Sequence, residues 1–239
     1  MEGFKQLATN HPHVFALIVT LTLYLFATAS FMLGMVIPAG GYKPHVGQII
    51  GRLITILVFV FIIWRFGWLT SAGLTRIGGW QQWLVLLVLV VYVVAAALYA
   101  YFGNFKLSIA SPKMAGVVAL SQLTIGMVEE TVYRGLVLYT FVRLWANTRW
   151  GLVASVLLSA LFFGASHMVW VAFGKPVLQS TLLSLSAFES GVFYGAIVLA
   201  SGSIWPAVIL HGLVNAAVNV NLIGFPNYQE TGNPDQVRK

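Results

Sequence analysis

The sequence predicts an all-α fold, a transmembrane bundle of about seven helices that encloses a membrane-embedded polar cavity. Of its 239 residues, 59% are hydrophobic and only 8% are charged, and the mean hydropathy is +0.88. Soluble domains carry roughly 25% charged residues, so this composition is typical of an integral membrane protein. A spanning helix needs about 20 apolar residues. Runs of such length begin near Val14, Gly47, Leu84, Met114, Gly151, Leu178 and Ile204.

The connections between these runs are short, so we expect one integral membrane domain over residues 1–239. The net charge of +7 comes from basic residues that we place near the ends of runs. They include Arg65, Arg76, Lys106, Lys113, Arg143, Arg149 and Lys175. Basic residues at helix ends face anionic lipid. Membrane lipid is therefore an expected partner, and nucleic acid is not.

Residue counts exclude several classes of site. The chain has no cysteine, which removes disulfides, thiol nucleophiles and thiolate metal sites. Its only aspartate, Asp235, lies in the polar C-terminal tail, so a pair of intramembrane aspartates is excluded. The zinc-protease motif H-E-x-x-H does not occur. Ser166 adjoins His167, but neighbours on a helix diverge by about 100°, which disfavours a Ser–His catalytic pair.

A few ionisable residues interrupt the apolar runs. Three of the six acidic residues do so, namely Glu129, Glu130 and Glu189, and His167 and His211 also lie within runs. An ionisable side chain in the bilayer core costs about 2.5 to 3.5 kcal/mol on the insertion scale. We therefore expect these side chains to face a cavity and each other.

The helix that carries the stretch GMVEETVYRGL is expected to begin at Pro112 and to continue to about Trp145. Proline suits the first position of a helix, and the stretch before Glu129 is too short to cross a bilayer alone. Glu130 and Arg134 are spaced i, i+4, which predicts an ion pair on one face. Glu129 points about 100° away and stays free to act. An interfacial turn with solvated charges is the alternative for this stretch.

Two later helices carry the other polar residues. In LFFGASHMVW, His167 follows Phe163 by four residues, and in AVILHGLVNAAVN, His211 and Asn215 share a face at i, i+4. Taken singly, each is compatible with a packing role, because membrane bundles use His and Asn for hydrogen bonds between helices. Together with the two glutamates and the arginine they supply most of the strongly polar side chains in the apolar segments.

These three patterns, E-E-x-x-x-R, F-x-x-x-H and H-x-x-x-N in that order, resemble those of the CPBP intramembrane proteases. The family is also called the Abi or type II CAAX prenyl endopeptidase family, and the resemblance covers residues 112–222. It implies peptide hydrolysis in a bacterial cell membrane, on prenylated or other membrane-associated peptide or protein substrates. It further implies that Glu129 and His167 activate water, that Glu130 and Arg134 brace the helix, and that His211 and Asn215 bind the oxyanion.

The chemistry is consistent with these roles. Attack of water on an amide needs a base, which a carboxylate supplies, and each oxyanion donor contributes about 3 kcal/mol. A zinc site formed by Glu129, His167 and His211 is the alternative. We favour a site without a metal cofactor, because the amide of Asn215 is a poor zinc ligand and a good oxyanion donor.

Glu189 lies outside the three motifs. We expect it to line the cavity, as Phe163 would, because it lies next to Gly191 and Gly195, where helices can approach closely. The buried acids and histidines also leave a second function open, a non-catalytic membrane scaffold or a proton-coupled transporter. Convergence of Glu129, His167, His211 and Asn215 on one cavity would favour the enzyme.

Overall fold

The fold is entirely helical in the part of the chain that the computed structural model describes, which confirms the predicted all-α class. The described residues are 2–36, 43–79, 112–218 and isolated positions between 81 and 95, and they include no strand. The helices are α1 (Glu2–Asn10), α2 (Pro12–Val36), α3 (Lys43–Arg65), α5 (Pro112–Val132), α6 (Tyr139–Trp145), α7 (Gly151–Ser166), α8 (Val177–Ser201) and α9 (Trp205–Val218). A π-helix, η2 (Tyr133–Leu138), joins α5 to α6, and a 3₁₀-helix, η3 (His167–Val171), follows α7.

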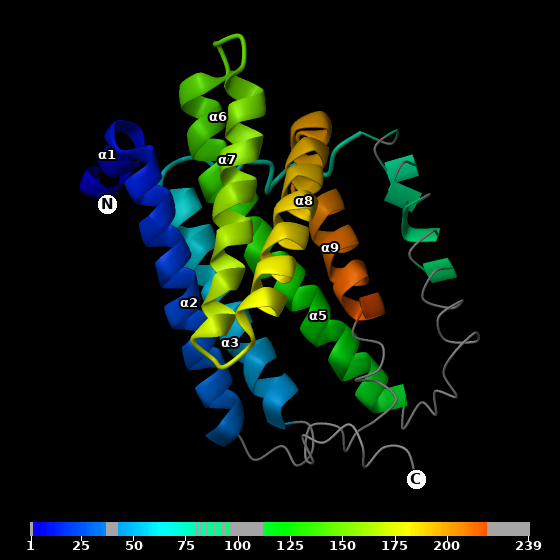
Figure 1. The fold of residues 1–239 in the computed structure, drawn as a ribbon. Coiled ribbons are helices and arrows are strands. Elements are labelled where there is room, and N and C mark those ends of the chain that lie inside the picture. The colour runs from blue at the N-terminus through cyan, green and yellow to red at the C-terminus, as the bar shows by residue number, and fades with distance from the viewer. Residues whose placement is uncertain are drawn as a thin grey trace.

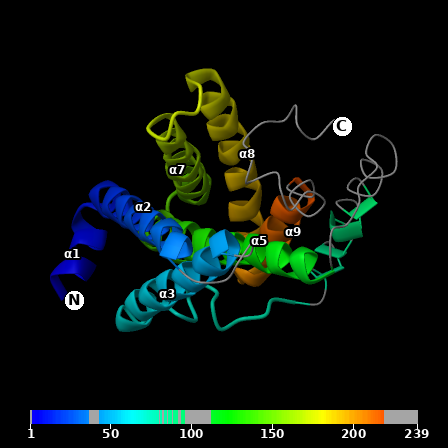
Figure 2. The ribbon, with the colours of Figure 1, turned by 90° about the horizontal axis from the view of Figure 1, so that it is seen from below.

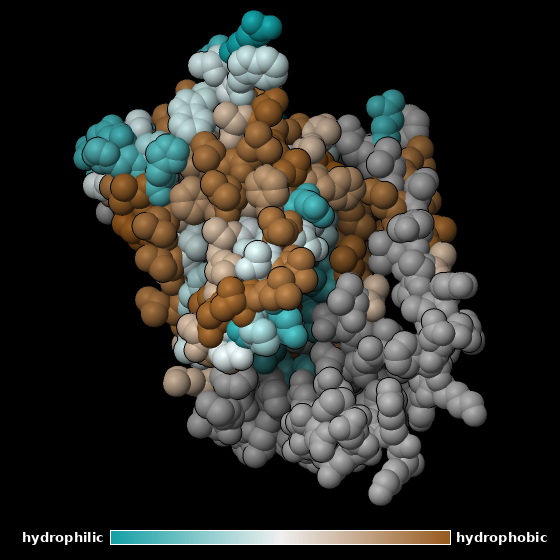
Figure 3. Space-filling model, in the orientation of Figure 1, coloured by the Kyte–Doolittle hydropathy of each residue, from teal (hydrophilic) through white to brown (hydrophobic). Residues whose placement is uncertain are grey.

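Four of these helical segments are long and apolar enough to cross a membrane. They are Pro12–Ser30, His45–Arg65, Gly151–Val171 and Val177–Ser201, and a shorter apolar segment covers Trp205–Ala217. Large apolar side chains are exposed on their outward faces, such as Leu25, Leu57, Leu161 and Leu182, and apolar residues cover much of the described part of the face in Figure 3. The protein is therefore an integral membrane protein. The expected run near Leu84 falls largely outside the described residues.

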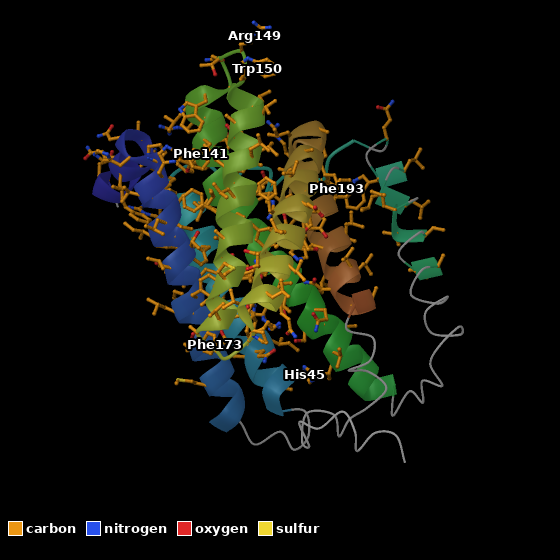
Figure 4. The ribbon with its side chains drawn as sticks, viewed as in Figure 1. His45, Phe141, Arg149, Trp150, Phe173 and Phe193 are labelled. Carbon is orange, nitrogen blue, oxygen red and sulfur yellow. The ribbon has the colours of Figure 1, made fainter. Side chains whose placement is uncertain are left out.

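The long helices run between two ends of the bundle, α2 and α7 in one direction and α3, α5 and α8 in the other (Figure 1). Arg149 and Trp150 mark one end, at the turn between α6 and α7, and His45 and Phe173 lie toward the other (Figure 4). α5 begins at Pro112, as its sequence predicts, and continues through η2 into α6. This rod carries the two glutamates and Arg134 through the centre of the bundle, where the other helices pack on it.

The N-terminal helices form the largest packed core with η2. Phe15 of α2, Phe59 and Ile63 of α3, and Leu136 of η2 are almost completely buried together. At the first end, Arg143 of α6 donates a hydrogen bond to the Thr9 hydroxyl at 3.0 Å. The helices α1 to α3 carry none of the three motifs. They support η2 and α6, which continue the helix that carries the two glutamates.

Glycines set two close helix crossings. A Cβ on Gly126 of α5 would lie 2.8 Å from the backbone nitrogen of Gly212 in α9. A Cβ on Gly191 of α8 would lie 3.0 Å from the Ala160 Cβ of α7. Small residues allow such approaches in membrane bundles. Seen along the bundle, α7 and α8 lie to one side of the row formed by α2, α3 and α5 (Figure 2). The polar residues lie where these groups of helices meet.

Candidate active site

Glu130 lies at the centre of the polar site. Its side chain is fully buried, with an exposed fraction of 0%, and both carboxylate oxygens have cationic or hydrogen-bonding neighbours. Oε2 lies 3.0 Å from the Arg134 Nε, one turn further along the helix, so the predicted i, i+4 pair is present. Oε1 lies 2.8 Å from the His211 Nδ1 of α9. Glu130 therefore joins the α5–η2 rod to α9.

Arg134 is enclosed on every side. Its exposed fraction is 1%, and its Nη2 donates a hydrogen bond to the Gly191 carbonyl of α8 at 3.1 Å. The guanidinium carbon lies 4.8 Å from the ring centroid of Phe163 and 5.6 Å from that of Tyr194. Cation–π contacts of this kind strengthen when water is excluded. Arg134 thus connects η2 to α7 and α8 while it neutralises Glu130.

The π-helix begins directly after the two glutamates, at Tyr133. The Tyr133 carbonyl accepts a hydrogen bond from the Ser159 hydroxyl of α7 at 2.8 Å. π-turns inside α-helices are rare and frequently lie at functional sites. No signal in the sequence predicts this one, because the run from Met114 to Trp145 contains no proline, and Glu130 and Arg134 are spaced as in a regular α-helix.

His211 lies between the two glutamates. The Nε2 atom lies 3.4 Å from the Glu129 Oε2, and Nδ1 faces Glu130. Nδ1 donates to Glu130, because a carboxylate only accepts. Tyr194 stacks on the His211 ring at 4.9 Å and 20° and fixes its plane.

The two glutamates therefore have different surroundings. Glu129 has an exposed fraction of 22%, whereas Glu130 has 0%. No direct hydrogen bond of the Glu129 carboxylate is found among the described residues, and its one close ionic neighbour there is His211. Glu130 is fully engaged with Arg134 and His211. Glu129 is the carboxylate that stays accessible.

His167 is the first residue of η3, at the end of α7. Its Nδ1 lies 2.9 Å from the Phe163 carbonyl, and because a carbonyl only accepts, Nδ1 carries a proton. The Nε2 atom of a neutral His167 is then left as an acceptor. Phe163 lies between the two histidines, with ring centroids 4.9 Å from His167 and 5.9 Å from His211. Phe163 itself is buried.

Asn215 and Glu189 differ in how deeply they are buried. Asn215 is half-buried on α9, one turn beyond His211. Glu189 is exposed on α8, and Leu185 and Phe193, one turn away on either side, are exposed too. The structure does not bring Glu189 into the network of ion pairs. Its role as a cavity residue stays a prediction, as do the catalytic roles of the motif residues.

The zinc alternative requires three converging ligands. Among the described residues, no three His, Asp or Glu side chains lie close enough together to hold a metal ion. His211 is already directed at Glu130 through Nδ1 and at Glu129 through Nε2. This donor arrangement does not fit a three-ligand site formed by Glu129, His167 and His211.

Arg52 is a neighbour of the site that the motifs did not reveal. It lies inside α3, where its Nη1 donates to the Ser121 carbonyl and hydroxyl of α5, both at 2.9 Å. Its Nη2 donates to the Gln48 side chain at 2.9 Å, and its charge interacts with that of Glu129. An arginine within an apolar run was the available signal, since such residues usually face a bundle interior.

Comparison with known proteins finds one matching family. Residues 111–217 match the family model of the type II CAAX prenyl endopeptidases, Rce1-like. The match covers almost all of the motif-bearing segment and confirms the family that the three motifs predicted. At the level of the family, this match supports a CAAX protease-type intramembrane endopeptidase. No curated protein and no solved structure matches the chain.

Proposed function

We propose, from the Rce1-like segment at residues 111–217 and the surroundings of its two glutamates, that this protein is a glutamate-dependent intramembrane endopeptidase. The observation that carries the proposal is the difference between adjacent acids. Glu130 is fully buried against Arg134 and His211, whereas Glu129 is partly exposed and faces the same histidine at 3.4 Å. Glu130 stabilises the site through its contacts, and Glu129 is free to take a proton.

Glu129 is the proposed general base. Its carboxylate accepts a proton from a water molecule as the water oxygen attacks the scissile carbonyl, with the Nε2 of His167 as a second acceptor for that water. The hydrogen bond between the His167 Nδ1 and the Phe163 carbonyl favours the tautomer in which Nε2 accepts. Positioned general bases contribute about 10²- to 10⁴-fold to rate.

His211 and Asn215 are the proposed oxyanion donors. For His211 to donate from Nε2 while Nδ1 donates to Glu130, both ring nitrogens must carry protons. Glu130 stabilises that doubly protonated ring, in the way that the carboxylate of a catalytic triad stabilises an imidazolium. Asn215 adds a neutral amide N–H from the next turn of α9. Each such donor contributes about 10²- to 10³-fold in kcat.

Collapse of the tetrahedral intermediate breaks the C–N bond. The leaving amine takes the proton that Glu129 received from water, so the carboxylate returns to its starting state. The fixed charges also favour this cycle, because Arg134 balances Glu130 within the bundle and Arg52 is a second cation that interacts with Glu129. No metal takes part in any step.

We propose a membrane-associated peptide or protein as the substrate, prenylated or otherwise anchored, reached by a multi-pass protein in a bacterial cell membrane. The bundle exposes apolar faces to lipid around a polar interior, which supports a substrate that arrives through the membrane. A non-catalytic scaffold needs no accessible acid beside a buried one, and no observation favours a proton-coupled transporter over hydrolysis.

Cleavage of a tagged membrane proteome by the purified protein tests the proposal. We expect C-terminally or internally truncated products from the parent and nearly none from Glu129→Gln, whose shape is unchanged. Glu2→Gln, at the exposed start of α1, is the matched control and should cleave at the parent rate. Equal cleavage by parent and Glu129→Gln would exclude Glu129 as the base.

A further inference from the structure

Four hydroxyl-bearing residues outside the three motifs lie near one another, and two of them, both tyrosines, lie near Glu129. They are Thr20 and Tyr24 of α2, Tyr133 of η2 and Ser166 of α7, here called the hydroxyl cluster. Tyr133, one helical turn after Glu129, lies within interaction range of the Thr20 and Ser166 hydroxyls, and Tyr24 lies within range of the Ser166 hydroxyl. Both tyrosines interact electrostatically with the Glu129 carboxylate. Two of the four residues come from the N-terminal half, which carries no motif.

Hydrogen bonds in the cluster are incomplete. Thr20 and Tyr133 have exposed fractions of 6% and 1%, and neither hydroxyl makes a hydrogen bond of standard geometry with the described part of the chain. The Ser166 hydroxyl donates to the Phe163 carbonyl at 2.5 Å, so it can only accept from its neighbours. Buried hydroxyls are rarely left without a partner, because the loss of hydration is then uncompensated.

The cluster borders the two residues that act on water in the proposed mechanism. Tyr133 packs on Phe163 with ring centroids 5.0 Å apart, and Phe163 packs on His167. The Ser166 Oγ lies 3.4 Å from the His167 Nδ1. The cluster therefore lies where α2 packs on the site, with Ser166 next to His167 and Tyr133 one helical turn after Glu129.

We propose that the hydroxyl cluster is a water-binding site that holds and supplies the nucleophile of the reaction. A buried water needs two to four polar partners, and the hydroxyls of Thr20, Tyr24, Tyr133 and Ser166 supply them. From this site a water passes its proton to Glu129 while its oxygen bonds to the substrate carbonyl carbon. Only the last step, in which the water loses a proton to Glu129 and attacks the substrate, rests on the proposed function.

Water binding is tested without activity by X-ray footprinting, in which hydroxyl radicals formed from ordered water label the adjacent side chains. Tyr133 should be labelled much faster than Phe141, which has an exposed fraction of 0% in an apolar core. In Thr20→Val, which keeps the shape and removes the hydroxyl, labelling of Tyr133 should slow. Labelling of Tyr133 no faster than that of Phe141 would show a dry cluster and overturn the proposal.

Supply of the nucleophile is tested by kinetics. Thr20→Val and Tyr133→Phe should each lower kcat by about 5- to 30-fold, which corresponds to about 1 to 2 kcal/mol, with KM unchanged within about 2-fold. Thr22→Val, whose hydroxyl bonds to the Ile18 carbonyl on α2, and Tyr139→Phe, which packs on Trp68, are the matched controls.

The two measurements separate the possible failures. Rapid labelling of Tyr133 combined with unchanged kcat in both variants would overturn the role in supply. If the parent protein cleaves nothing, the proposed function fails, and footprinting alone then decides whether the cluster binds water. Melting temperatures in detergent, measured for every variant, show whether a lower kcat reflects unfolding.

Discussion

Replacement of Arg134 by methionine should destabilise the protein far more than replacement of Glu129 by glutamine. Methionine keeps most of the side-chain volume, so the change removes the charge with little cavity. The Glu130 carboxylate, with an exposed fraction of 0%, then keeps only His211 as a partner. Breaking a buried ion pair by the loss of one member costs about 3 to 5 kcal/mol.

The magnitude follows from the contacts that each variant loses. The Arg134→Met variant loses the 3.0 Å ion pair with Glu130 and the 3.1 Å hydrogen bond to the Gly191 carbonyl. Glu129→Gln loses a 3.4 Å contact of a partly exposed group, which costs under about 1 kcal/mol. Each 1 kcal/mol shifts the melting temperature of a chain of this size by roughly 2–4 °C. We therefore expect decreases of about 6–20 °C for Arg134→Met and under about 4 °C for Glu129→Gln.

Thermal unfolding in detergent, followed by the fluorescence of the eight tryptophans, measures both shifts. The double variant Glu130→Gln with Arg134→Met is the internal control, because a neutral glutamine leaves no buried charge. It should recover more than half of the loss. Equal shifts for the two single variants, or a double variant no more stable than Arg134→Met, would show that the pair is not buried as described.

Three further predictions concern the oxyanion donors, the α5–α9 crossing and metal. Asn215→Ala should lower kcat by about 10²- to 10³-fold with little change in KM, and an equal rise in KM would instead indicate a role in substrate binding. Gly212→Val should lower both stability and kcat, because its Cβ would lie 2.8 Å from the Leu123 side chain. Gly116→Ala, with nothing within 4 Å of the new Cβ, is the control, and equal behaviour of the two would exclude a tight crossing. Exhaustive chelation should leave activity intact in a sample that elemental analysis finds free of zinc, whereas activity restored by one equivalent of zinc would reject the metal-free mechanism.

Local spacing in the sequence predicted the features that one helix determines alone. The start of α5 at Pro112 and the pair between Glu130 and Arg134 depend on residues a few positions apart. The composition predicted the helical bundle, because few other folds satisfy backbone hydrogen bonds in lipid. The three ordered motifs predicted the family, which the match over residues 111–217 confirms.

Contacts between distant helices could not be predicted in this way. The sequence predicted that the buried acids and histidines would face each other, but not that the His211 Nδ1 would bind Glu130, 81 positions away. Tyr194, stacked on the same ring, is another partner of this kind. Which faces meet depends on where α5 and α9 cross, and the crossing is set by Gly126 and Gly212. A single glycine in an apolar run does not show which helix it will meet.

The π-helix at Tyr133–Leu138 also affects how the chain tolerates changes in length. Its i→i+5 hydrogen bonds place more residues in a turn than the 3.6 of an α-helix, so the helical wheel before Tyr133 and the wheel after Leu138 are out of register. A one-residue deletion within this segment can be absorbed by relaxation to a regular α-helix, and α5 and α6 keep their buried faces. The same deletion in α5 or α6 would rotate every later side chain by about 100°. Natural length variation along residues 112–145 should therefore concentrate in these six residues.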